Sequence, residues 1–315
     1  MKEVVLVPGD GIGPEITESA IRIIEAAGAE ISWRWIEAGK KVLEKTGRTI
    51  PPKFFDEAIE TGVVLKGPVS TPVGGGFRSV NVTIRQRLNL YANVRLVKSV
   101  PGVRALHDDV DIVVVRENTE GLYSGIERES STGAIETVKV TSQEASERIG
   151  RFAFDYARSR GRRHVTIVHK ANILKKGDGL FLKSISSLAQ QYPGIAVSDM
   201  MVDNAVYQLV TDPAQFDLIV TQNLYGDIIS DLCAQMVGGL GFGCSGNIGD
   251  NLAVFEPTHG SAPKYAGQYK VNPIATILAA NMMLDWLGVA VKAHALEIAV
   301  TAVIMQGTVR SSEMG

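Results

Sequence analysis

The sequence GDIISDL at residues 226–232 places two carboxylates, Asp227 and Asp231, four residues apart. It follows the apolar run at residues 218–220, so the pattern predicts a buried strand and then a helix. Positions i and i+4 lie on one face of a helix, where a solvated like-charged pair costs about 0.2–0.5 kcal/mol. In a less polar cleft the pair would repel by about 3 kcal/mol unless a cation lay between the two carboxylates. Oxygen ligands of this kind suit Mg²⁺ or Mn²⁺.

Short apolar runs alternate with amphipathic stretches along the chain. Strands are predicted at residues 4–7, 63–65, 112–115, 165–168, 195–197 and 218–220, and helices at residues 14–27 and 142–160. This alternation is typical of an α/β protein with a largely parallel sheet. The helix at 142–160 is expected to open with a capping box formed by Thr141 and Glu144. Residues 136–140 alternate polar and apolar side chains, which predicts an arm or hairpin that projects from the body.

The composition is that of an ordinary globular protein. Of 315 residues, 45% are hydrophobic and 21% are charged, and the formal net charge is −2. This charge gives no reason to expect nucleic acid or an acidic membrane surface as a partner. The two cysteines imply neither a disulfide framework nor a zinc cluster. The chain opens directly with a strand and has no apolar run of about 18 residues, so we expect a soluble, cytoplasmic protein.

The segment PGDGIGP at residues 8–14 follows a strand and opens a helix, as a dinucleotide-binding fingerprint would. After Gly9 and Gly11 the third glycine is Gly13, two positions further on instead of three. A turn that needs positive φ angles explains these glycines equally well. The spacing therefore argues against a standard Rossmann fold.

Polar residues that suit a carboxylate ligand stand near the predicted strand ends. They are Ser79, Asn81, Arg85, Arg95 and Arg116, preceded by a glycine-rich loop at residues 71–76. Arg116 ends the predicted strand at 112–115, and open α/β sheets place their ligands at such ends. Because arginine binds carboxylates through a planar fork, a substrate with several carboxylates would fit if these side chains converge. Taken singly, each arginine is better explained as a surface residue.

Lys170 closes the apolar strand at 165–168, and Tyr123 in LYSG (122–125) is a second candidate for proton transfer. Loss of water at the strand end would make the amine of Lys170 a better general base. A lysine that extends from a strand end into solvent explains the position equally well. His169 is better explained as a packed histidine than as a metal ligand, because no second histidine stands at ligand spacing.

Five blocks of sequence resemble the β-decarboxylating dehydrogenases, the family of isocitrate, homoisocitrate and 3-isopropylmalate dehydrogenases. They are PGDGIGPE (8–15), RENTEG (116–121), VHKAN (168–172), NLYGDIISD (223–231) and HGSAP (259–263), in the family's order. The resemblance covers nearly the whole chain and implies a non-Rossmann fold of two α/β domains. Residues 1–90 plus 239–315 would form the large, cofactor-side domain. Residues 91–238 would form the small domain, which carries the dimer contacts and the metal site.

The resemblance also implies roles in catalysis. Arg85, Arg95 and Arg116 match the family's clamp for substrate carboxylates. Tyr123 and Lys170 match its catalytic acid and base. The implied reaction is the oxidative decarboxylation of a tricarboxylate hydroxy acid, and isocitrate is the substrate that links it to the tricarboxylic acid cycle.

Three aspartates match the family's ligands for Mg²⁺ or Mn²⁺. They are Asp203, Asp227 and Asp231. Lys170 and Asp203 are expected to act in the partner subunit's site. Active sites shared in this way imply a homodimer.

Ser79 and Asn81 resemble the isocitrate branch, in which a serine and an asparagine hold the third carboxylate. The isopropylmalate branch has apolar residues there, and a pocket built to hydrogen-bond its ligand rejects an apolar analogue by about 10⁴-fold. Homoisocitrate differs from isocitrate by one methylene, worth only about 1–3 kcal/mol, and is the alternative substrate. A non-catalytic regulatory subunit is the alternative of another class, although such relatives lose one or more of the matched catalytic positions.

The resemblance assigns a set of residues to cofactor binding. They are Thr71, His259, Gly260, Ser261, Ala262, Lys264, Tyr265 and Asn272. NAD-using members tend to carry an acidic residue at position 264, so Lys264 and Tyr265 favour NADP. NAD stays the alternative, because Ser311 and Gly315 stand where NADP-using members add a tyrosine and an arginine.

Overall fold

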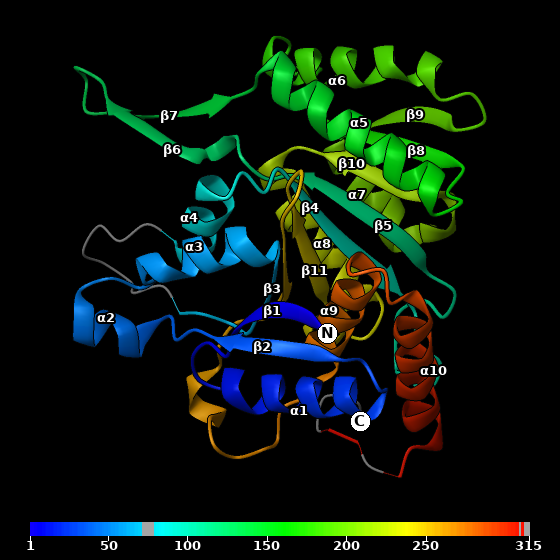
Figure 1. Ribbon diagram of the computed structural model, residues 1–315. Coiled ribbons are helices and arrows are strands. Elements are labelled where there is room, and N and C mark those ends of the chain that lie inside the picture. The colour runs from blue at the N-terminus through cyan, green and yellow to red at the C-terminus, as the bar shows by residue number, and fades with distance from the viewer. Residues whose placement is uncertain (71–78, 309, 312–315) are drawn as a thin grey trace. The chain divides into compact units, whose positions relative to one another are not determined.

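The computed structural model describes residues 1–70, 79–308 and 310–311, and these form two compact units (Figure 1). Unit 1 comprises Met1–Leu90, Ser99–Asp108 and Val237–Gly315 as far as they are described, and unit 2 comprises Tyr91–Lys98 and Asp109–Met236. Residues 99–108, which the sequence analysis assigns to the domain 91–238, group instead with unit 1. There Val103 packs with Phe242 and Ile304 in a small hydrophobic cluster.

The described part of unit 1 is built around five strands. Its elements are β1 (Lys2–Val7), α1 (Gly13–Ala26), β2 (Ile31–Trp35), α2 (Lys40–Thr46), α3 (Pro52–Thr61), β3 (Val63–Lys66), α4 (Val80–Arg87), β11 (Cys244–Ile248), β12 (Ala253–Pro257), α9 (Ile274–Trp286) and α10 (Ala290–Gln306). The strand order is β2-β1-β3-β12-β11. All neighbours are parallel except β11 and β12.

Burial explains why β1 and β3 are continuous apolar runs. Parallel strands are covered on both faces, so they carry no exposed polar side to alternate with. Phe54 of α3 and Ile84 of α4 pack in the same cluster as Val5 and Val64. Helix α9, which is apolar around its whole circumference, contacts β3, β11, β12, α1 and α10 and is largely buried.

Unit 2 contains a second set of five strands and a separate ribbon. Its elements are β4 (Ala92–Lys98), β5 (Asp111–Glu117), β6 (Gly121–Glu129), β7 (Ile135–Val140), α5 (Gln143–Ser159), β8 (His164–His169), α6 (Gly177–Leu188), β9 (Ala196–Met201), α7 (Val202–Thr211), β10 (Leu218–Thr221) and α8 (Asn223–Met236). The order is β4-β5-β10-β8-β9, with β4 antiparallel to β5 and the others parallel. Helices α5 and α6 lie together, as do α7 and α8 (Figure 1).

The predicted α/β class and the helix at 226–232 are confirmed, and β6 and β7 form the expected hairpin as an antiparallel ribbon. The predicted cap of α5 is wrong by one residue. The N-cap is Ser142, whose side chain accepts the N–H of Ala145 at 3.1 Å. Glu120 accepts the backbone N–H of Ser142 at 2.9 Å, the bond that a capping box would give to the side chain of the third helical residue, here Ala145, which has no acceptor. A residue distant in sequence has therefore replaced the local partner.

None of the described helices has both the length and the apolar character needed to cross a membrane. Their apolar faces are instead used for packing within the units, as at Ile149 of α5 and Ile229 of α8, which are both fully buried.

Candidate active site

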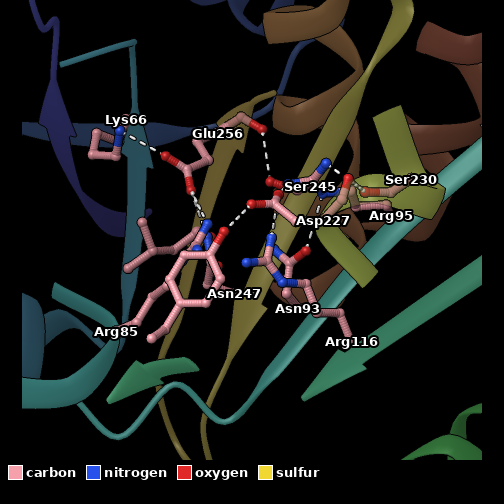
Figure 2. Close-up of polar contacts among 12 residues, drawn as sticks. Lys66, Arg85, Asn93, Arg95, Arg116, Asp227, Ser230, Ser245, Asn247 and Glu256 are labelled. Atoms are coloured by element: carbon pink, nitrogen blue, oxygen red, sulfur yellow. Dashed lines mark hydrogen bonds and ion pairs between the residues drawn. The ribbon is translucent and has the colours of Figure 1, made fainter. Parts of the chain in front are cut away.

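The two aspartates of the GDIISDL sequence lie on one face of α8, as predicted, because both contact Arg95 of β4. The Nη1 atom of Arg95 is 2.8 Å from Oδ1 of Asp231, and its Nη2 atom is 3.1 Å from Oδ1 of Asp227. Arg95 also donates to the hydroxyl of Ser230 at 2.6 Å. Figure 2 shows Arg95 beside Asp227 and Ser230. One guanidinium thus offsets the repulsion that the paired carboxylates would otherwise have.

Arg116 is the most deeply buried charge at this site. It lies near the carboxyl end of β5, and its side chain is only 1% exposed. Its Nη1 atom is 2.5 Å from Oδ1 of Asp227 (Figure 2), while Nε and Nη2 donate to Oδ1 of Asn223 at 3.0 and 2.6 Å. Asn223, the first residue of α8, thereby fixes the orientation of the guanidinium.

Gly226 makes room for Arg116. A Cβ atom at Gly226 would lie 2.6 Å from Cγ and 2.7 Å from Cβ of Arg116, closer than packed carbons approach. The absence of a side chain at this helix position is therefore needed for Arg116 to pass across α8.

Replacing Gly226 by Ala should displace the Arg116 side chain and raise KM for a carboxylate substrate about tenfold, the effect of weakening one bond to a charged group. Alanine alone would favour the helix by about 1 kcal/mol, so unfolding of α8 is not the expected cause. Gly179→Ala in α6 is the matched control, because no atom lies within 4 Å of the Cβ position there. Steady-state kinetics and thermal melting measure both variants; an unchanged KM in Gly226→Ala would contradict the steric role.

Tyr123 of β6 completes the group around Asp227. Its hydroxyl donates to Oδ2 of Asp227, and the guanidinium of Arg116 lies 5.2 Å from the centre of its ring. Burial, together with the hydrogen bond to Asp227, raises the pKa of Tyr123. The phenol therefore keeps its proton at neutral pH, as a proton donor requires.

Lys170 and Asp203 form a second pair in unit 2, at the end of β8 and the start of α7. The ammonium group of Lys170 donates to Oδ1 of Asp203, and this hydrogen bond lowers the pKa of Asp203. The side chain of Lys170 is 25% exposed. The sequence left open a desolvated strand end or a lysine that extends into solvent, and the structure shows a partly exposed ion pair. His169 is buried and bonded to Asp199 and to the backbone N–H of Ala171, as expected of a packed histidine.

A buried network that the sequence analysis did not predict lies beside Lys170. Asp178 is fully buried and accepts the backbone N–H of Lys170 at 2.7 Å and the ammonium of Lys139 at 2.5 Å. Gln222 accepts from the same ammonium at 2.6 Å. Burial lowers the pKa of Lys139 although Asp178 opposes this. The one signal of this network in the sequence was Lys139, within the alternating strand at 136–140.

The aspartates have the right ligand chemistry for a divalent cation, but too few of them lie together within one chain. Among the residues that the structure describes, no three His, Cys, Asp or Glu side chains are grouped so that they could hold a metal ion. Asp203 therefore does not join Asp227 and Asp231 within one chain. The latter two supply hard oxygen ligands of the kind that Mg²⁺ and Mn²⁺ prefer. A complete site would need ligands from elsewhere, which is what the predicted shared site requires.

Arg85 lies in unit 1, in a buried charged cluster with Glu256. Oε1 of Glu256 accepts from Nη2 of Arg85 at 3.5 Å and from Nδ2 of Asn247 at 2.8 Å, while Oε2 lies 2.7 Å from Nζ of Lys66 (Figure 2). Burial alone would raise the pKa of Glu256, but the charges of Lys66 and Arg85 outweigh it and hold the pKa at about 2. Two cations against one carboxylate leave this cluster with a net positive charge, which suits an anionic ligand.

Several polar atoms at and near Arg85 could form further hydrogen bonds. Nε of Arg85 and Oδ1 of Asn81 are buried and have no hydrogen-bond partner among the described residues. Ser79 is the N-cap of α4, and its side chain makes no cap bond. Glu256 and Lys66 were not predicted from the sequence, although each is a charged residue within an apolar strand, which was the available signal.

The described residues assigned to the cofactor lie in unit 1, in and after the loop that follows β12. They are His259, Gly260, Ser261, Ala262, Lys264, Tyr265 and Asn272, whereas Thr71 lies outside the described residues. The ammonium of Lys264 lies 4.7 Å from the ring centre of Tyr265. Asn272 is 1% exposed and holds the start of α9 by accepting the N–H of Ile274 at 2.9 Å.

The chain belongs to the isocitrate/isopropylmalate dehydrogenase family, whose model matches residues 3–314. This is a family of dehydrogenases, and the fold predicted from the resemblance is confirmed.

Two curated relatives and one solved structure illustrate the range of similarity. A mitochondrial regulatory subunit of isocitrate dehydrogenase (NAD) from Dictyostelium discoideum is 46% identical over 316 residues, which cover 100% of this chain and 88% of the relative. The chloroplastic 3-isopropylmalate dehydrogenase of Solanum tuberosum is 45% identical, over 96% of this chain and 85% of the relative. The crystal structure of isocitrate dehydrogenase from Methylococcus capsulatus is 47% identical, with a TM-score of 0.96 and coverage of 100% and 94%.

Proposed function

We propose that this chain oxidatively decarboxylates isocitrate to 2-oxoglutarate and CO₂, with a divalent cation and NAD(P). The observation that carries the proposal is the environment of Asp227. One carboxylate of the acidic pair contacts two arginines, Arg95 and Arg116, and the phenol of Tyr123. Two anion-binding arginines and a proton donor thus surround one carboxylate, Asp227, which is itself a candidate cation ligand.

Each side chain has a task in this reaction. Arg95, Arg116 and Arg85 bind the substrate's carboxylates through charge-assisted hydrogen bonds. Coordination of a cation by Asp227 and Asp231 would release Arg95 for this purpose. When bound, the cation supplies Lewis-acid polarisation of the C2 oxygen, which makes loss of the β-carboxylate feasible.

Two proton transfers complete the chemistry. A bound nicotinamide would accept the hydride from C2. The substrate's hydroxyl proton must pass to a base when C2 is oxidised, and we assign this role to Lys170 of the partner subunit. After CO₂ has left, C3 takes up a proton, and Tyr123 is the donor. The phenol suits this role because its raised pKa keeps it protonated. We accordingly propose a homodimer with shared active sites.

Isocitrate is favoured over the other substrates of the family by Ser79 and Asn81. The unpartnered Nε–H donor of Arg85 and the positive cluster around it favour a polar, anionic group over an isopropyl group. Homoisocitrate remains the alternative, because both substrates present a third carboxylate.

A regulatory subunit is the second candidate, since one relative at 46% identity carries that name. Against it, every matched position of the arginine clamp, the acid, the base and the metal ligands holds the expected residue type. Following NAD(P)H absorbance with isocitrate, homoisocitrate and isopropylmalate, each with Mg²⁺ or EDTA, tests both. We expect turnover with isocitrate and Mg²⁺ only. No change in NAD(P)H absorbance with any of the three substrates would favour the regulatory role.

We further propose that the cofactor is NADP, because the cation of Lys264 and the hydroxyl of Tyr265 suit a 2′-phosphate. The relatives named as NAD enzymes point the other way. Lys264→Asp is expected to lower kcat/KM for NADP at least about tenfold, the effect of one lost charged contact, while kcat/KM for NAD is maintained. Lys270→Asp in the same loop is the control. A wild-type preference for NAD above about tenfold would defeat the proposal.

A further inference from the structure

The glycine-rich segment at residues 8–15, which fails as a dinucleotide fingerprint, packs against the loop at 259–272. The N–H of Ile12 donates to the carbonyl of Ser261 at 2.9 Å. A Cβ atom at Gly11 would lie 2.0 Å from that carbonyl oxygen, and Gly11 has a φ of +58°. The backbones of the two segments therefore meet at a distance that only glycine permits.

Glu15, in the first turn of α1, ties down the far end of the same loop. Its Oε1 accepts the backbone N–H of Gly267, and its Oε2 accepts the backbone N–H of Tyr269 at 2.8 Å. Glu15 is only 9% exposed. Each carboxylate oxygen thus holds one amide of the loop.

The backbone of this turn needs such support. Gly267 has a φ of +76° and Tyr269 a φ of +50°, so a bulky residue is held in the left-handed region. That conformation is unfavourable for tyrosine and persists where its surroundings fix it. The bonds to Glu15 bracket this part of the loop on both sides of Gln268.

We propose that Glu15 is a positioning residue for the nicotinamide cofactor, an inference that rests on the proposed function. By fixing residues 267–269, it holds the loop that carries Lys264 and Tyr265 in the shape that binds the adenosine end. Loss of the carboxylate leaves two amides without their acceptor, and the loop must then be ordered at the expense of cofactor binding. Tyr123 and Lys170, the proposed acid and base, lie in unit 2, so the chemical step is not directly affected.

The test compares Glu15→Ala and Glu15→Gln with Glu18→Ala, an exposed glutamate on the same helix. In Glu15→Ala we expect KM for NADP and its Kd by calorimetry to rise about tenfold, which corresponds to the loss of hydrogen bonds to a charged group. Glu15→Gln keeps one acceptor oxygen and should fall between wild type and Glu15→Ala. KM for isocitrate and kcat at saturating cofactor should stay within about twofold of wild type.

Hydrogen exchange supplies a readout independent of turnover. Amides 266–269 should exchange faster in Glu15→Ala than in wild type or Glu18→Ala, while the rest of the chain is unchanged. Unchanged cofactor affinity in Glu15→Ala would overturn the inference. So would a fall in kcat together with equal rises in KM for NADP and for isocitrate and a lower melting temperature. If the wild type bound the cofactor but did not turn over, the proposed function would be contradicted. The role of Glu15 could still be tested from the Kd for the cofactor.

Discussion

Replacing Asp227 by Asn is expected to lower kcat by about a hundredfold or more while the fold is retained. The amide has the shape of the carboxylate but not its charge, so the buried Arg116, which is 1% exposed, loses its counter-ion. The hydroxyl of Tyr123 loses an ionised acceptor, and the acidic pair loses half of its charge for binding a cation. Initial rates at saturating isocitrate and cofactor, measured over a Mg²⁺ titration, report this loss.

Asp155→Asn, on the surface of α5, is the control for a general effect of removing a carboxylate from unit 2. Circular dichroism melting and gel filtration should show the same fold and assembly for both variants. Activity of Asp227→Asn close to that of wild type would remove Asp227 from the active site. Recovery of full kcat at high Mg²⁺ would reduce its role to affinity for the cation.

Replacing Lys170 by Met should also lower kcat about a hundredfold or more, because methionine keeps much of the side-chain length but has no amine to accept a proton. The loss should appear in kcat more than in KM for isocitrate, since the proposed clamp is intact. Lys175→Met, an exposed lysine in the following segment, is the matched control. If Lys170→Met retained near-full activity, the base would have to be another residue.

Mixing the two inactive variants tests whether active sites are shared. In a mixed dimer of Asp227→Asn and Lys170→Met chains, a shared arrangement gives one site with both defects and one with none. Random pairing makes half of the dimers mixed, so about a quarter of wild-type activity should return after unfolding and refolding together. Sites built within single chains would give no recovery, because every chain carries a defect.

Local pattern predicted a helix at 226–232, within the observed Asn223–Met236, and the common face of Asp227 and Asp231, because helical periodicity depends only on near neighbours. The buried strands β1, β3, β8 and β10 were predicted from their short apolar runs, which are also a local pattern. The glycine spacing at residues 8–14 correctly argued against a Rossmann fingerprint, and the structure shows the use of Gly11 instead: close contact with Ser261. The cap of α5 was mispredicted, because the side chain that completes it belongs to Glu120, outside the helix.

The sequence by itself determined the α/β class, the family, and the identity of the charged and hydroxyl groups available for chemistry. Only the tertiary structure decided which group pairs with which. Arg95 reaches Asp227 across 132 residues, and Arg85 reaches Glu256 across 171. Periodicity records the burial of each segment but not the partner of a buried charge. That partner depends on the distance and dielectric surroundings created when remote segments pack, and these also set the low pKa of Glu256 and the raised pKa of Tyr123.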